Sequence, residues 1–128
     1  MLNSFSINDN SLSEDKRFET AVDLFNSAEW YEAHDAFEEL WHESVEPERT
    51  TLQGFLQIAV AQVHLERANK VGATILFGEG LGRLRRSGIP DLGLDLEELC
   101  SFVADRLNCL QHEIEFDLSS APRLCKRF

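Results

Sequence analysis

The chain has 128 residues, of which 43% are hydrophobic and 9% aromatic, so it can bury the core of one domain. Twelve basic and 23 acidic residues give a net charge of −11, which opposes binding to nucleic-acid phosphates and to anionic membrane surfaces. No segment approaches the roughly 20 apolar residues of a membrane span. We therefore expect no nucleic-acid and no membrane partner. Three widely spaced cysteines are typical of a reducing compartment and predict a cytoplasmic location.

The first half of the chain predicts two helices after a flexible N-terminus at residues 1–12. The residues Ser11–Glu14 have the pattern of a capping box, which opens the first helix. Apolar side chains then recur at helical spacing from Phe18 to Phe25. The second helix begins near Trp30, and its apolar stripe continues to Trp41, while an acidic stripe on the opposite side is expected to face water.

A third helix is predicted to begin at Thr50, with Gln53 at the reciprocal position of a capping box. It is nearly apolar from residue 52 to residue 65, which predicts the most buried helix of the fold. A fourth helix follows over about residues 71–86. Its glycines at positions 78, 80 and 82 predict either a close approach of another helix or a kink.

A fifth helix is predicted from Asp95 to about His112, because Asp95 and Glu98 have capping-box spacing. Residues 113–128 include a proline and show no period, so we expect an irregular tail that docks through Leu124 and Phe128.

A weak internal repeat supports the order of these helices. A shift of 40 residues places Ala28 on Ala68, and Phe37 on Phe77. Two copies of a helix–turn–helix unit predict stacked antiparallel hairpins. The fold class is therefore all-α: a compact bundle of about five helices, formed by two tetratricopeptide-like hairpins, a C-terminal helix and the tail, with residues 13–112 as a single helical domain.

Polar side chains border the apolar stripes of the second and third helices, which is unusual in a core. At about 100° per residue they fall on one side of each helix. These candidate site residues are His34, Glu38, Trp41, Gln53, Gln57 and His64. Since buried polar groups need partners, we expect them to hydrogen-bond one another or to line a small polar cavity.

Two interpretations of this polar set stay open. In the first, it is a structural network that ties the second helix to the third. In the second, it is a site in which His34, Glu38 and His64 act as acid–base groups or ligands of a divalent metal, and Gln57 orients a substrate. The pair Glu39 and His42 matches the Glu-x-x-His motif of di-iron bundles, but the motif has no second copy, and both residues are expected on the solvated side.

The chain resembles a known family, the small domain of unknown function numbered 309, over about residues 20–90. Two blocks carry the resemblance, one in the second helix and one in the third. The matching residues are Phe25-Asn26, Tyr31 to Asp35, Glu38 to Trp41, Leu52 to Gly54, Gln57, Ala59, Ala61, His64, Asn69, Gly72 and Ala73. The resemblance implies a compact all-α domain of bacteria, archaea and plastids with no established activity. This chain departs from the family pattern at Asp35, where glutamate is favoured, and at Ala68, where glycine is usual.

Two functions follow from the sequence. The first is a binding or adaptor module that meets a protein partner through one helical face. The second is a small enzyme, or a protein that binds a small ligand or metal, which uses His34, Glu38, Gln57 and His64. The sequence does not indicate the partner, substrate, cofactor or oligomeric state.

Overall fold

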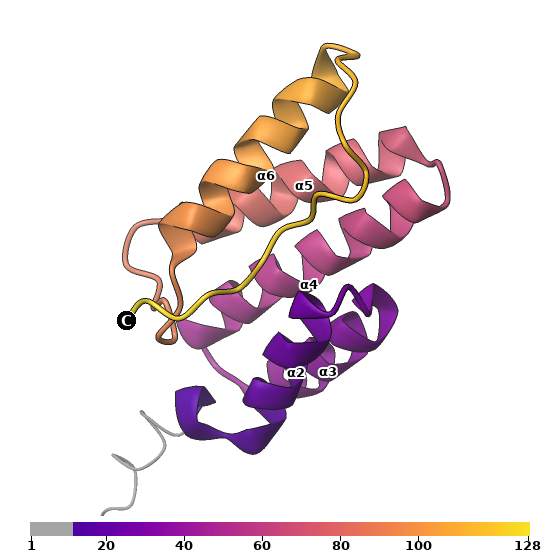
Figure 1. The fold of residues 1–128 in the computed structure, drawn as a ribbon. Helices are drawn as coiled ribbons and strands as arrows, with labels where there is room; N and C mark the ends of the chain where they lie inside the picture. Colours follow the sequence, from indigo (N-terminus) through magenta and orange to yellow (C-terminus); the bar gives the residue numbers. More distant parts are fainter. Residues whose placement is uncertain (1–11) are drawn as a thin grey trace, which may run out of the picture.

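The chain is helical along most of its length. A computed structural model describes residues 12–128. Its helices are α2 (Lys16–Asn26), α3 (Trp30–Glu43), α4 (Glu48–Glu66), α5 (Lys70–Leu84) and α6 (Leu96–Gln111) (Figure 1). Within residues 12–128, the only strand-like pairing is an isolated bridge between Leu94 and Lys126. The all-α prediction is confirmed, and the predicted flexible segment 1–12 lies outside the described residues except for Leu12.

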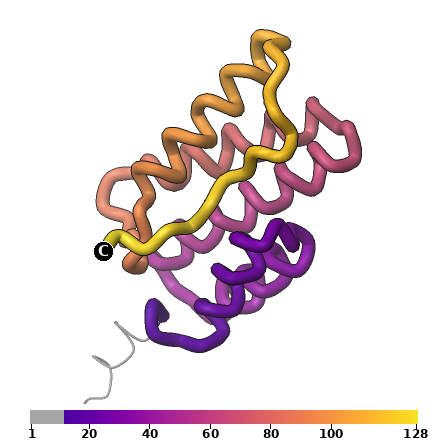
Figure 2. Tube along the Cα trace, viewed as in Figure 1, coloured from indigo at the N-terminus to yellow at the C-terminus, as the bar shows by residue number. Residues whose placement is uncertain are grey.

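Neighbouring helices in the sequence are also neighbours in space. α2 packs against α3, α3 against α4, α4 against α5, and α5 against α6 (Figures 1 and 2). This order corresponds to the predicted hairpins α2–α3 and α4–α5, with α6 added against α5. α4 consequently lies between α3 and α5, and it is the most buried helix, as predicted.

The two hairpin turns share one geometry, which supports the internal repeat. Ala28 and Ala68 have φ values of 60° and 59°, in the left-handed region. After each alanine, the next backbone N–H donates to the carbonyl five residues earlier, as in a Schellman motif. These bonds join Glu29 to Leu24 at 2.9 Å and Asn69 to His64 at 2.8 Å. Glycine adopts this backbone conformation without strain, which accounts for the family's usual glycine at position 68.

Four fully buried phenylalanines, one on each of the helices from α2 to α5, form the centre of the core. Phe25, Phe37, Phe55 and Phe77 are fully buried. The rings of Phe37 and Phe55 lie 5.5 Å apart and join α3 to α4. Phe37 and Phe77 are the pair that the 40-residue shift superposes, so the repeat places equivalent side chains in equivalent core positions.

Two helix starts differ from the prediction. The α2 cap is Asp15, whose carboxylate accepts from the Arg17 backbone N–H at 2.8 Å, and Ser11 of the predicted capping box lies outside the described residues. α4 begins at Glu48 rather than Thr50. The Glu46 carboxylate accepts from the Thr50 backbone N–H at 3.1 Å and from its hydroxyl at 2.6 Å, so these groups are already satisfied before Gln53 is reached. By contrast, Asp95 caps α6 as predicted.

The predicted close approach of helices occurs at Gly80. A Cβ atom at this position would lie 2.9 Å from the Ile58 side chain and 3.1 Å from the Gly54 carbonyl oxygen. Gly54 faces the same contact from α4, where a Cβ would meet Leu84 at 2.6 Å. Gly82 has open space around it. Only one of the three predicted glycines in α5 is therefore required for the α4–α5 contact.

The C-terminal tail is irregular, as predicted, and runs back across the helices towards the loop before α6 (Figure 1). The side chain of Asn26 bonds to both the backbone N–H and the carbonyl of Leu124, at 2.7 and 2.9 Å. Near the end of the tail, the Arg127 N–H donates to the Gly93 carbonyl at 3.0 Å. The prediction that Leu124 docks is confirmed, whereas the prediction for Phe128 is wrong, because its side chain is 98% exposed beyond the last of these contacts.

Candidate functional site

One side of α4 is only partly covered by its neighbours. Between residues 50 and 65, the residues that are not buried are Gln53, Leu56, Val60, Val63 and His64. At about 100° per residue, all of them fall within an arc of about 100°. We call this side of α4 the open face. Because α4 lies between α3 and α5, these two helices flank the open face.

The α3 side of the open face carries three of the predicted residues. His34, Glu38 and Trp41 are all half-buried and share one flank of α3, since they are spaced by four and three residues. Trp41 places this flank of α3 next to the start of α4. The guanidinium of Arg49, at the start of α4, lies 3.8 Å from the centre of the Trp41 ring. The Trp41 Nε1 and Arg49 Nε atoms are both buried and have no hydrogen-bond partner among residues 12–128.

His34 and Glu38 belong to a compact group that also contains Asp35. One side-chain ligand atom from each of these residues lies within 4.8 Å of the other two. The His34 Nδ1 atom is 3.1 Å from the Asp35 carboxylate. The His34 side chain is 23% exposed and the Asp35 side chain is 63% exposed, so the group is anchored in α3 and reaches solvent.

Gln57 forms its hydrogen bonds with α5. Its amide nitrogen donates to the Glu79 carboxylate at 3.0 Å, and its carbonyl oxygen accepts from Arg83 at 3.3 Å. The residue is only 8% exposed, so an unpaired amide here would be costly. Glu79 and Arg83 are one turn apart on α5. These contacts make Gln57 a polar tie between α4 and α5 at the edge of the open face.

His64 supports the turn between α4 and α5. Its Nδ1 atom is 3.1 Å from the side-chain nitrogen of Asn69, and the side-chain oxygen of Asn69 caps α5 by accepting from the Gly72 backbone N–H at 2.9 Å. A Cβ on Gly72 would come within 3.0 Å of the His64 ring. The family-like residues His64, Asn69 and Gly72 thus form one helix cap, in which His64 Nδ1 accepts the amide hydrogen.

The predicted polar set is therefore gathered on one side of α4 but divided between different partners. The expected hydrogen bonds between its α3 and α4 members do not occur among the described residues. Instead Gln57 bonds to α5, His64 bonds within its own turn, and Gln53 makes no side-chain hydrogen bond in residues 12–128. The expectation of a site at these residues stays a prediction.

The sequence reasoning missed Glu79, Arg83 and Asp35. Arg83 was not among the predicted site residues, although its spacing of four residues from Glu79 was a signal for a polar flank. Asp35 was assigned to the solvated stripe, and it is indeed exposed, but it also contacts His34. Glu39 and His42 are exposed, as predicted.

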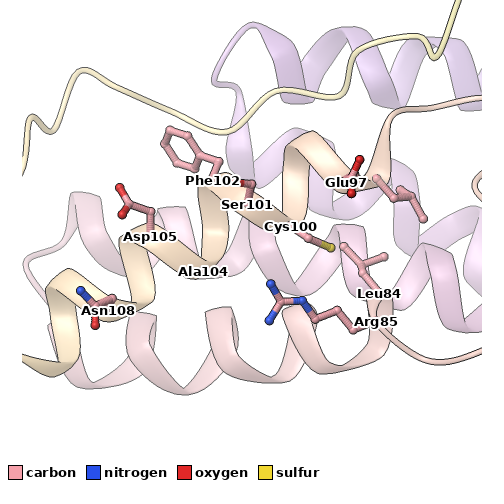
Figure 3. Close-up of a pocket in the computed structure, with 10 residues that line it drawn as sticks. Leu84, Arg85, Glu97, Cys100, Ser101, Phe102, Ala104, Asp105 and Asn108 are labelled. Atoms are coloured by element: carbon pink, nitrogen blue, oxygen red, sulfur yellow. The ribbon is translucent and has the colours of Figure 1, made fainter.

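A separate hollow lies between the end of α5 and the side of α6 (Figure 3). Its lining residues include Arg85, which directly follows α5, and Cys100, Asp105 and Asn108 from α6. Burial raises the pKa of the Cys100 thiol, and the nearby Arg85 charge only partly offsets this effect. A thiol with a raised pKa is a weak nucleophile at neutral pH, and none of the predicted polar residues lines this hollow.

Comparison with known proteins agrees with the family resemblance. Residues 18–76 match the family described as "Domain of unknown function (DUF309)". A protein of Bacillus subtilis (strain 168), described as the uncharacterized protein YpuF, is 34% identical to the chain. The alignment covers 67% of this chain and 53% of that relative, so the chain spans about half the length of the relative that it matches. The matched range contains most of α2, all of α3 and α4 and the first turns of α5, and it includes every residue of the open face.

No helix within residues 12–128 combines the length and the apolar character that crossing a bilayer needs.

Proposed function

Because residues 18–76 match the DUF309 family, whose function is not established, we propose that the protein is a binding module with the open face of α4 as its ligand surface. The observation that supports this proposal is the exposure pattern of α4. A helix that is buried on every other side leaves one continuous strip partly accessible, and this helix packs against both α3 and α5.

The chemistry of the open face favours a protein partner. Three of its five residues, Leu56, Val60 and Val63, are apolar, and the other two are Gln53 and His64, while Glu38 and Glu79 belong to the neighbouring helices α3 and α5. An apolar strip bordered by polar and charged residues is the usual composition of a protein interface. We therefore expect a partner segment that presents an apolar side chain between basic residues. The net charge of −11 would also speed the approach of a basic segment.

Catalysis has less support at this surface. Gln57 uses both ends of its amide on α5, and His64 uses Nδ1 on Asn69. These contacts remove two of the four groups that an enzyme mechanism here would require. The second candidate, a metal-binding or small-ligand protein, is favoured by one observation only, the proximity of His34, Asp35 and Glu38.

Val60 allows a direct test of the proposal. Peptides selected from a random displayed library would be titrated into the full-length protein, and binding would be followed by Trp fluorescence and by backbone amide shifts. Val60→Arg places a positive charge in the apolar strip, so we expect it to weaken binding of apolar–basic peptides at least about tenfold.

Val71→Arg is the matched control. Val71 lies on α5, is 73% exposed, and does not belong to the open face. The Val71→Arg variant should bind the same peptides with wild-type affinity. Equal affinities of the Val60→Arg variant and the wild type would refute the proposal, as would amide shifts concentrated away from α3, α4 and α5.

A further inference from the structure

We propose that the outward side of α5 is the contact surface of a symmetric dimer, with a second copy of this chain as its occupant. The surface consists of Val71 and Ile75 on α5 and of Ile114 and Leu118 from the segment after α6, and we call it the α5 patch. It contains no residue of the open face of α4, so the inference goes beyond the proposed binding of a partner segment.

The α5 patch gathers exposed apolar side chains. Val71 and Ile75 are four residues apart, so they share one side of the helix, and they are 73% and 54% exposed. Ile114 and Leu118 are 50% and 69% exposed, and they line the same hollow as Val71. Together they are four of the seven large apolar side chains that residues 12–128 leave exposed. A concentration of this kind marks an interaction site, since single exposed apolar residues are normally scattered.

Beyond Ile75, the same side of α5 carries no bulky side chain. Gly78 and Gly82 continue the row at helical spacing. A Cβ at Gly82 would meet nothing within 4 Å, and one at Gly78 would only reach Leu107 at 4.0 Å. A second helix can therefore approach the backbone of α5 closely here. In an antiparallel copy of α5, the large side chains of each helix would lie against the glycine half of the other.

The charge of α5 favours a second copy as the occupant. The helix contains Lys70, Arg83 and one acidic residue, Glu79, whereas the whole chain has a net charge of −11. Of the helices α2 to α6, it alone has a net positive charge. Two copies of an acidic protein repel each other, so they can meet most easily through this helix.

The two ends of the surface are complementary in charge. Glu113 and Glu115 line the hollow at the start of α5, and together they outweigh the single positive charge of Lys70. At the opposite end, Arg85 and Arg86 directly follow α5 and are exposed. A two-fold axis across the middle of α5 makes the two helices antiparallel. It sets the acidic end of each copy beside the basic end of the other, so the same ionic contact forms twice.

The length of α5 limits the strength of this dimer. Its 15 residues extend over about 22 Å, which places the contact at the small end of specific interfaces. We therefore expect a dissociation constant on the order of 10–100 µM.

Sedimentation velocity of the full-length protein from about 1 to about 500 µM tests the inference. The apparent mass should rise with concentration from 14.6 kDa towards twice that value, and it should rise less at high salt. Ile75→Arg places a charge near the centre of the contact and should raise the dissociation constant at least about tenfold. Val45→Arg is the matched control, because Val45 is 75% exposed between α3 and α4 and lies outside the α5 patch. The Val45→Arg variant should dimerise like the wild type.

A charge exchange tests the antiparallel arrangement. Glu113→Arg and Arg86→Glu should each raise the dissociation constant at least about threefold, and the double variant should regain wild-type dimerisation because it restores opposite charges. Far-UV circular dichroism would show that each variant remains folded. A wild type that stays monomeric at about 500 µM would overturn the inference. Equal dimerisation of Ile75→Arg and the wild type would do the same, as would a double variant no stronger than the single variants.

The dimer and the proposed binding module can fail separately. Ile75→Arg should lose dimerisation and keep the binding of peptides at the open face, whereas Val60→Arg should lose peptide binding and keep dimerisation. Loss of both properties in Ile75→Arg would overturn the separation of the two surfaces.

Discussion

The contact between α4 and α5 makes a quantitative prediction at two glycines of the same helix. Alanine at Gly80 would place a Cβ 2.9 Å from Ile58 and 3.1 Å from the carbonyl oxygen of Gly54. Alanine at Gly82 would meet nothing within 4 Å. Since the carbonyl belongs to the backbone of α4, the first variant can fit only if the two helices move apart.

The expected difference in unfolding free energy follows from comparing the two variants. Replacing glycine by alanine inside a helix favours folding by up to about 1 kcal/mol, and both variants receive this gain. Overpacking a tight contact costs about 1–3 kcal/mol, and only Gly80→Ala incurs that cost. The unfolding free energy of Gly82→Ala should therefore exceed that of Gly80→Ala by about 1–3 kcal/mol, with Gly82→Ala more stable than the wild type.

Urea denaturation followed by circular dichroism at 222 nm would measure both free energies, because one or two kcal/mol displaces the midpoint by a readily measured amount. Equal stabilities of the two variants would refute the reasoning, since they would mean that α4 and α5 do not approach closely at Gly80.

Three further predictions concern the turn, the tail and the first helix. Ala68→Gly should raise the unfolding free energy by about 0.5–1 kcal/mol in urea denaturation, because it relieves a left-handed alanine; a loss of stability would contradict this. Arg106→Ala should lower the unfolding free energy by about 1–3 kcal/mol and expose residues 113–128 to trypsin, since Arg106 is buried and donates to the tail carbonyl of Ser120 at 2.9 Å. Unchanged cleavage would show that Arg106 does not hold the tail in place. Hydrogen bonds from Arg17 lower the pKa of Asp15 and Glu43 below the usual 3.8 and 4.5. The stabilisation that these two carboxylates gain from Arg17 is therefore present above their usual pKa values and is lost as the pH falls through the lowered pKa values. The melting temperatures of Arg17→Gln and wild type should consequently converge in acid. A constant difference from pH 7 to pH 2 would refute the assignment.

Much of the fold could be predicted from local sequence signals. Helix periodicity gave each helix to within a few residues, since burial of one side of a helix requires apolar residues at helical spacing. The starts of α2 and α4 were harder to predict, because several residues in each segment can act as a cap. Asp15 caps α2, and Glu46, which precedes α4, accepts from the Thr50 backbone N–H and hydroxyl; both contacts depend on how the preceding chain enters the helix.

The candidate site was predicted as a set of residues, whereas its connections were not. Gln57 lies at the edge of the α4 open face, where a side chain could reach either flanking helix. Its position on α4 is a local property, but its partners Glu79 and Arg83 follow from the packing of α5 against α4. For the same reason, His64 was expected beside Glu38 and instead completes a turn with Asn69.

By itself, the sequence determined the helices, their order, the repeated hairpin and the residues that border the core of α3 and α4. These features depend on neighbours three or four residues away, or on one turn repeated at a 40-residue interval. Only the tertiary structure decided which side of α4 stays open, which glycine permits close packing, and that His34, Asp35 and Glu38 converge while His64 does not. Those outcomes depend on the positions of neighbouring helices, which a helical pattern within one segment does not contain.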